Sequence, residues 1–139
     1  MKQLVIGLSG FTTVGIVIYW VLVFTGVFKV IEVIPGYRNW FMAFLLADAW
    51  IAICSLLTAI FLFLDDEKTV LFGLLTGSSL IFLRLYALLY GITTGLIFHP
   101  TTDNIIEILT KLYCLSVGAF FIIYFWHLRN TFGNIVERY

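Results

Sequence analysis

Four long apolar stretches dominate this chain of 139 residues and limit what it can fold into. We expect them at residues 4–28, 41–64, 69–92 and 104–127, and each is about as long as the ~20-residue helix that crosses a bilayer. In hydrocarbon, only helices and closed barrels satisfy every backbone polar group internally. The sequence therefore predicts an all-α integral membrane protein, an antiparallel four-helix bundle that forms one transmembrane domain over residues 1–139.

The composition agrees with this prediction, because 62% of the residues are hydrophobic and only 12% are charged. A soluble domain carries about 25% charged residues, and a chain this short cannot bury so much apolar surface in a core of its own. The lipid bilayer is therefore the expected surrounding. The net charge is zero and there is no basic patch, so nucleic acid is not an expected partner.

The connections between the spans predict an orientation. Four spans place both termini and the charged turn at residues 65–68 on one side, with the linker at 29–40 and the loop at 98–103 on the other. In the first linker we expect a short interfacial segment that is broken at Pro35-Gly36. Lysine and arginine are slightly more numerous on the terminal side, which favours cytoplasmic termini. The near balance also permits a dual topology, as in small transporters that dimerise head to tail.

Two charges lie well inside the apolar spans, Asp48 in the second and Arg84 in the third. Each lies roughly 10 Å from the linker side by helical rise, so antiparallel neighbouring helices are predicted to bring the two together. Ionisable groups inside a membrane are expensive and tend to mark function. A structural alternative is that the pair only holds two helices in register.

Further polar side chains fall in the same half of the predicted bundle. Glu107 and Lys111 are one turn apart on the fourth span, and Tyr86 and Tyr90 are one turn apart on the third. With the two buried charges they form the predicted ligand-binding set: Asp48, Arg84, Tyr86, Tyr90, Glu107 and Lys111. The alternatives are an ordinary i,i+4 ion pair for Glu107 and Lys111, and interfacial anchoring for the tyrosines.

Each span also has a stripe of small or polar residues, the kind of face through which helices pack in lipid. The stripes are Gly7, Gly15 and Gly26 in the first span, with Thr12 and Tyr19 close to that face; Asp48, Ala52, Ser55 and Ala59 in the second; Gly73, Gly77, Arg84, Ala87, Gly91 and Gly95 in the third; and Glu107, Lys111, Cys114 and Gly118 in the fourth. We expect these faces to point into the bundle.

No motif for catalysis or for a cofactor is present. The chain lacks H-E-x-x-H, G-x-S-x-G and a phosphate-binding glycine loop. Cys54 and Cys114 form no C-x-x-C pair and fall at different expected depths, while His99 is expected in a solvated loop. The sequence thus predicts no catalytic residue, no metal site and no cofactor.

Two short segments carry a resemblance, FLLADAW at residues 44–50 and LLYGITTG at residues 88–95. In the Ala-Asp step early in the second span, and in a tyrosine with a glycine five residues later, the chain resembles small four-span prokaryotic membrane proteins of unassigned function over residues 40–126. Such proteins often carry an acid shortly before that tyrosine, where this chain has Ala87. The layout is also similar in architecture to four-span sterol-binding or isomerase proteins.

The leading functional hypothesis is a noncatalytic protein that binds a small amphiphile or lipid in a polar pocket, with Asp48 and Arg84 at its floor. One alternative is a small dimeric transporter in which Asp48 exchanges protons. Another is an accessory or scaffold subunit whose small-residue stripes pack against a membrane partner protein. A membrane enzyme with an acid–base pair ranks last, because no specific motif supports it.

Overall fold

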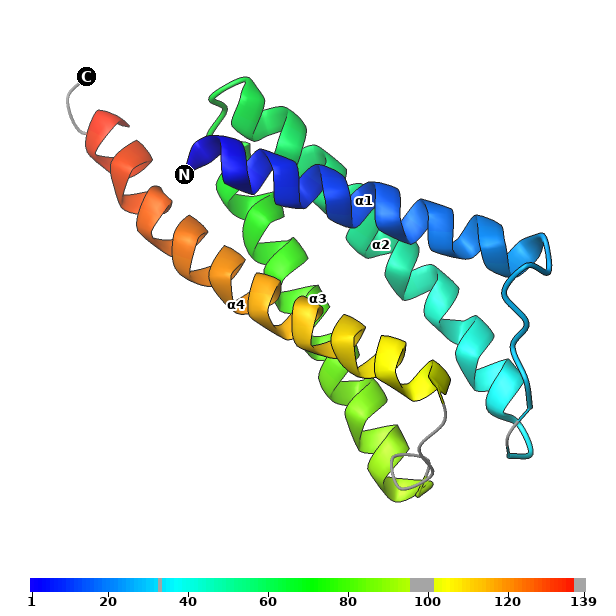
Figure 1. Cartoon of the computed structure of the whole chain (residues 1–139). Helices are drawn as coiled ribbons and strands as arrows, with labels where there is room; N and C mark the ends of the chain where they lie inside the picture. The colour runs from blue at the N-terminus through cyan, green and yellow to red at the C-terminus, as the bar shows by residue number, and fades with distance from the viewer. Residues whose placement is uncertain (33, 96–101, 137–139) are drawn as a thin grey trace. The chain divides into compact units, whose positions relative to one another are not determined.

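The computed structural model describes the backbone of residues 1–32, 34–95 and 102–136, and the side chains of residues 1–32, 34–95 and 108–130. This part of the chain contains four helices and no strand (Figure 1): α1 at Lys2–Phe24, α2 at Tyr37–Phe63, α3 at Lys68–Thr93 and α4 at Thr102–Val136. All four are long and apolar enough to cross a membrane. The prediction of an all-α protein with four membrane spans is confirmed.

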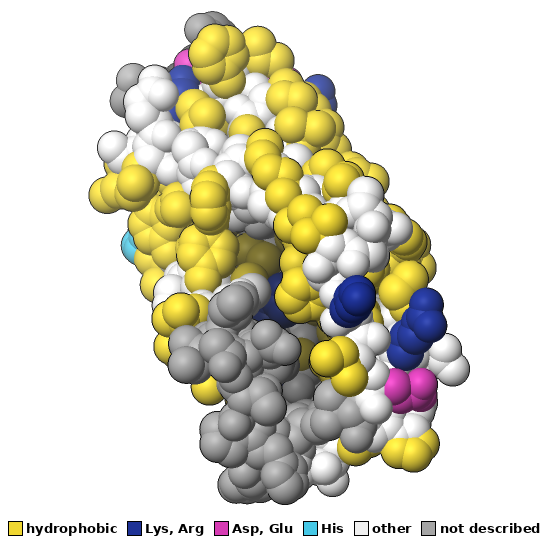
Figure 2. Space-filling model, turned by 45° about the vertical axis from the view of Figure 1, so that its right-hand side comes forward, with side chains coloured by type: hydrophobic (Ala, Val, Ile, Leu, Met, Phe, Trp, Pro, Cys, Tyr) yellow, Lys and Arg dark blue, Asp and Glu magenta, His cyan; other side chains and the backbone are white. Residues whose placement is uncertain are grey.

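Large apolar side chains point outward along all four helices. Leu46 of α2 is 81% exposed and Phe82 of α3 is 72% exposed. In Figure 2 hydrophobic side chains cover much of the visible face, while charged side chains gather mainly toward its ends. A soluble protein rarely exposes so much contiguous apolar surface. The helices therefore suit a hydrocarbon solvent, and the chain is a multi-pass membrane protein.

The chain divides into two compact units, Met1–Phe72 and Gly73–Tyr139, and each is described by itself. The first unit holds α1, α2 and the first residues of α3. The second holds the rest of α3 together with α4. The boundary falls inside a continuous helix, so α3 takes part in both units.

In the first unit, α1 and α2 run antiparallel and are joined by a seam of polar contacts. The Trp20 indole donates a hydrogen bond to Asp48, and the Ser55 hydroxyl donates one to the Ser9 carbonyl oxygen, 3.0 Å away. Thr13 donates to the carbonyl of Ala52 across the same interface, at 3.3 Å. Because helices in lipid gain nothing from hydrophobic association, such hydrogen bonds and small contact residues hold the pair together.

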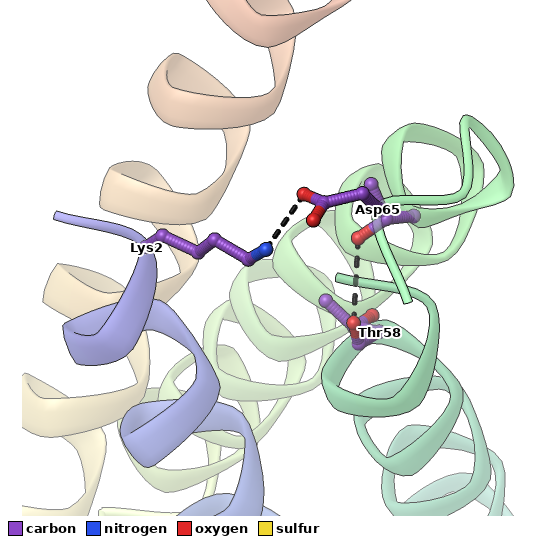
Figure 3. A network of polar contacts seen from close by, with 4 residues as sticks. Lys2, Thr58 and Asp65 are labelled. Carbon is purple, nitrogen blue, oxygen red and sulfur yellow. Dashed lines mark hydrogen bonds and ion pairs between the residues drawn. The ribbon is translucent and has the colours of Figure 1, made fainter. Parts of the chain in front are cut away.

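An ion pair closes this seam at the terminal end. The Lys2 ammonium lies 2.6 Å from Oδ1 of Asp65, just beyond the end of α2, as Figure 3 shows. Both side chains are partly exposed, at 38% and 74%, so the pair contributes at most about 1 kcal/mol to stability. Its place at the helix ends fits the water-facing edge of the unit.

In the second unit, α3 and α4 pack antiparallel through glycines. A Cβ on Gly118 would lie 2.8 Å from the Gly77 carbonyl oxygen, and a Cβ on Gly77 would meet the Gly118 carbonyl oxygen at the same distance. One turn along α3, Gly73 lies against the ring of Phe125, which is fully buried together with Phe121. The absence of side chains at these glycines lets the two backbones approach closely.

The predicted faces are confirmed for three helices and wrong for one. The buried stripes of α2, α3 and α4 follow the prediction, with Ala52, Ala87 and Gly118 among their buried residues. In α1, however, Gly7 and Gly15 are exposed, and a Cβ at either position would meet nothing within 4 Å. The α1 residues that are buried are Val5, Ser9, Thr12 and Trp20, and of these the prediction placed only Thr12 close to the inward face.

Two helix boundaries also differ from the prediction. The first linker contains no helix at residues 29–32 or 34, so the expected interfacial segment is irregular chain there, although it turns at Pro35-Gly36 as predicted. Gly36 takes a φ of 84° immediately before α2, a conformation that glycine adopts without strain. At the other end, α4 has 35 residues, about 52 Å at ~1.5 Å per residue, so it extends well beyond a ~30 Å hydrocarbon layer.

The turn into α3 depends on Asp66, and we predict a pH dependence for it. The Lys68 backbone N–H donates to the Asp66 carboxylate at 2.9 Å, and this bond, with the nearby Lys68 ammonium, lowers the pKa of Asp66. Because the folded pKa lies below the unfolded one, the bond stabilises the fold above the unfolded value of ~3.9 and is lost as pH falls through the folded pKa. A carbon-13 NMR titration of the carboxyl should therefore give a midpoint below ~3.9. A midpoint at or above that value would contradict the bond.

Candidate functional site

Asp48 is the buried acid of the first unit. It lies on the small-residue face of α2, one turn before Ala52, and is 7% exposed. Trp20 of α1, itself 5% exposed, donates its indole N–H to Oδ2 of Asp48 at 2.9 Å. An ionised acceptor makes this a stronger hydrogen bond than one between neutral groups. The carboxylate therefore has a fixed donor inside the membrane-spanning part of the chain.

Aromatic rings surround this hydrogen bond on the linker side of α1 and α2. The Trp20 ring centroid lies 5.7 Å from that of Phe41 and 5.9 Å from those of Tyr19 and Phe24. Such ring pairs favour edge-to-face and tilted packing, which is what these interplanar angles of 38–81° show. The rings hold in place the indole that donates to the Asp48 carboxylate.

Trp20 was not among the predicted partners of Asp48. A signal was present, since Trp20 follows Ser9 by eleven residues, or about three helical turns, and so shares a face with it. The predicted inward face of α1 was instead based on its glycines, which lie on a different side of the helix. Trp20 thus joins the candidate site as the residue that positions the Asp48 carboxylate.

Arg84 is the candidate basic residue of the second unit. The side chain is partly buried on α3, between Leu83 and Ala87, which are both 6% exposed. Its Nε is buried and finds no hydrogen-bond acceptor among the described residues. A buried donor without an acceptor costs about 1–3 kcal/mol, and more when the group is charged. Arg84 is therefore a charged group with a buried donor that no described residue satisfies.

The contact between the glycines places Lys111 near the level of Arg84. Arg84 follows Gly77 by seven residues along α3, and Lys111 precedes Gly118 by seven residues along the antiparallel α4. Seven residues are almost two full turns, so each base lies on the same face as its glycine and ~10 Å from the crossing. The described part of the second unit thus brings these two predicted residues to one level.

The other predicted residues divide into three groups. Tyr90 is partly buried, about two turns beyond Arg84, whereas Tyr86 is 49% exposed. Tyr86 also follows Arg84 by only two residues, which turns its ring toward the opposite side of α3 and favours the interfacial-anchor alternative. The side chain of Glu107 lies outside the described residues, and so does His99.

The pairing of Asp48 with Arg84 remains a prediction. Asp48 belongs to the first unit and Arg84 to the second. Among the described residues no cluster of histidine, cysteine and acidic side chains is suited to a metal ion. Cys54 and Cys114 are buried free thiols.

Comparison with family models, curated proteins and solved structures finds no significant match to this chain. The resemblance to small four-span prokaryotic proteins therefore remains a prediction. Function rests on the chemistry of these two charges: an aspartate that accepts from a fixed donor, and an arginine whose buried Nε finds no acceptor among the described residues.

Proposed function

We propose that this membrane protein binds a small amphiphile or lipid through polar groups of α3 and α4, on the side of the loop that joins them. The observation that carries the proposal is the buried Nε of Arg84, which finds no acceptor among the described residues. Placing an arginine in a membrane-spanning helix costs roughly 2.5–3.5 kcal/mol on insertion scales. A polar headgroup at Arg84 would offset part of that cost by accepting its hydrogen bonds.

The proposal gives each residue a role. Arg84 is the floor of the site and lies nine residues, or ~14 Å, from the end of α3 at Thr93. Lys111 on α4 and Tyr90 on α3 are its walls. Asp48, Tyr86 and Glu107 remain predicted members of the site.

Native mass spectrometry of the purified protein tests this function. We expect the wild-type protein, extracted in a mild detergent, to carry the added mass of one retained amphiphile, and Arg84→Gln to lose it. Arg129→Gln is the matched control, because this exposed arginine stacks 3.9 Å from the Trp126 ring near the end of the apolar part of α4. A wild-type protein without added mass, or equal retention in both variants, would argue against the proposal.

The buried carboxylate of Asp48 favours a second candidate function, a small transporter that exchanges protons. The acid is 7% exposed inside a membrane-spanning helix and has a fixed donor in Trp20. Acids in such positions recur in proton relays. We expect proton flux coupled to substrate in proteoliposomes, and its loss in Asp48→Asn, whose amide oxygen still accepts from the indole. Flux that persists in Asp48→Asn would remove this candidate.

A further inference from the structure

The charges of the second unit have one sign wherever side chains are described. Between Gly73 and Gly95, and between residues 108 and 130, the charged side chains are Arg84, Lys111 and Arg129, and none is acidic. Arg84 and Lys111 lie at one level, two turns from the glycine crossing. An arginine side chain keeps its charge in proteins. Arg84 therefore keeps its positive charge on a helix, α3, whose side chains include no acid.

The geometry of a guanidinium restricts what satisfies it. Arginine presents its N–H donors in a planar fork that matches the two oxygens of a carboxylate or a phosphate. A neutral ester or hydroxyl accepts a hydrogen bond but leaves the charge uncompensated. Burying an uncompensated charge is far more costly than burying a paired one. An anionic oxygen pair is thus the partner that fits the buried Nε of Arg84 best.

Apolar surface lies directly beside the charge. Leu88, one turn along α3 from Arg84, is 37% exposed, and Leu85 is 51% exposed. Both side chains are exposed where an acyl chain of the bilayer would lie against them. A ligand with an acidic head and an apolar chain would contact both the charge and these leucines.

We infer that the amphiphile bound at Arg84 carries an anionic headgroup, a carboxylate or a phosphate, whose oxygens accept hydrogen bonds from the guanidinium. This inference rests on the proposed function and adds the chemical class of its ligand. The shared chemistry is an oxyanion on an apolar chain, and a fatty acid and an acidic phospholipid both supply it.

Matched pairs of amphiphiles test the headgroup. Wild-type protein, stripped of lipid in neutral detergent, is incubated with oleate or methyl oleate, and with phosphatidic acid or diacylglycerol. Inorganic phosphate serves as the probe without a chain. We expect each acidic member to be retained at least about tenfold better than its neutral counterpart in native mass spectra, because a hydrogen bond to a charged group is worth ~1.5–3 kcal/mol. The better retained of the two acids identifies its source.

Variants of Arg84 then test whether this residue binds the anionic headgroup. Arg84→Gln should abolish the preference for the acidic member. Arg84→Lys should keep part of it, since an ammonium retains the charge but lacks the fork. Arg129→Gln, which removes the same charge from an exposed position, should leave the preference unchanged. If Arg84→Gln does not fold, a weaker preference for the acidic member in Arg84→Lys than in the wild type supports the role of Arg84, and an equal preference contradicts it.

Each contrary result has a distinct meaning. Equal retention of acidic and neutral members overturns the anionic headgroup and leaves the proposed amphiphile binding intact. Retention of no amphiphile at all removes the proposed function itself. A preference that survives unchanged in both Arg84 variants overturns the assignment to this residue. Binding of inorganic phosphate as tight as that of phosphatidic acid overturns the amphiphile as the ligand in favour of a free anion.

Discussion

Gly118→Ala is expected to destabilise the protein by about 1–2 kcal/mol, although alanine is the better helix former. In an unconstrained helix, replacing glycine by alanine stabilises by up to ~1 kcal/mol. At Gly118, however, the new Cβ would lie 2.8 Å from the Gly77 carbonyl oxygen, a backbone atom that cannot rotate away. Relieving this contact requires α3 and α4 to separate, and overpacking of this kind costs about 1–3 kcal/mol. The free energy of unfolding, followed by circular dichroism during a titration of mixed micelles with sodium dodecyl sulfate, measures the loss.

The control for this change is Gly15→Ala in α1. A Cβ there would meet nothing within 4 Å, so we expect no loss of stability and a gain of at most ~1 kcal/mol from helix propensity. Gly77→Ala should reproduce the loss, because its Cβ would meet the Gly118 carbonyl oxygen at 2.8 Å. If Gly118→Ala and Gly15→Ala changed stability in the same direction and to the same extent, the close approach of α3 and α4 would be refuted.

Hydropathy predicted the four spans because length and apolarity decide which segments cross a bilayer, but it could not place every helix end. The fourth span was expected to end at residue 127, where the apolar stretch ends, whereas α4 continues to Val136. Helical hydrogen bonding does not require apolar side chains, so a helix continues into water wherever nothing breaks it. The turn at Pro35-Gly36 was predicted and is present, but α2 begins directly after it at Tyr37, four residues before the expected start of the second span at residue 41.

The inward face of a helix was predicted correctly where its small residues contact another helix. It was missed in α1, where the small residues contact no other helix. Gly77 and Gly118 lie on the stripes expected for them, but the glycines of α1 face outward. A sequence pattern identifies a smooth face without showing whether a neighbour covers it. In α1 the neighbour instead covers Ser9, whose backbone carbonyl accepts from the Ser55 hydroxyl, and Trp20, whose indole donates to Asp48.

The sequence predicted two charged residues inside the spans, Asp48 and Arg84, but it did not predict the hydrogen-bond donor to Asp48. Asp48 is buried and Arg84 is partly buried, in keeping with the cost of exposing charge to lipid. The donor to Asp48 turned out to be a tryptophan, a residue that is usually assigned to packing or to the membrane interface. A buried aspartate suggests a charged partner, whereas one donor observed at Asp48 is the neutral indole N–H of Trp20.

Trp20→Phe is expected to destabilise the protein by about 1–3 kcal/mol, mainly through one lost hydrogen bond. Phenylalanine keeps an aromatic ring among Tyr19, Phe24 and Phe41 but cannot donate to the Asp48 carboxylate. Asp48 is 7% exposed, so water replaces the missing donor poorly, and removing one partner of a buried pair costs about that amount. The matched control is Trp50→Phe, since Trp50 lies on the same helix as Asp48 and is 51% exposed. We expect this control to change the free energy of unfolding by less than ~0.5 kcal/mol.

A double-mutant cycle with Asp48→Asn separates the charge from the hydrogen bond. The asparagine oxygen still accepts from the indole, but a neutral acceptor makes a hydrogen bond about half as strong as a charged one. Trp20→Phe should therefore cost roughly half as much in the Asp48→Asn background as in the wild type, when both are measured by the same unfolding titration. An equal cost in the two backgrounds would show that Asp48 accepts this bond as a neutral acid. A proton would then already be bound at Asp48 at the working pH, which is the state that a proton-exchanging transporter requires before release.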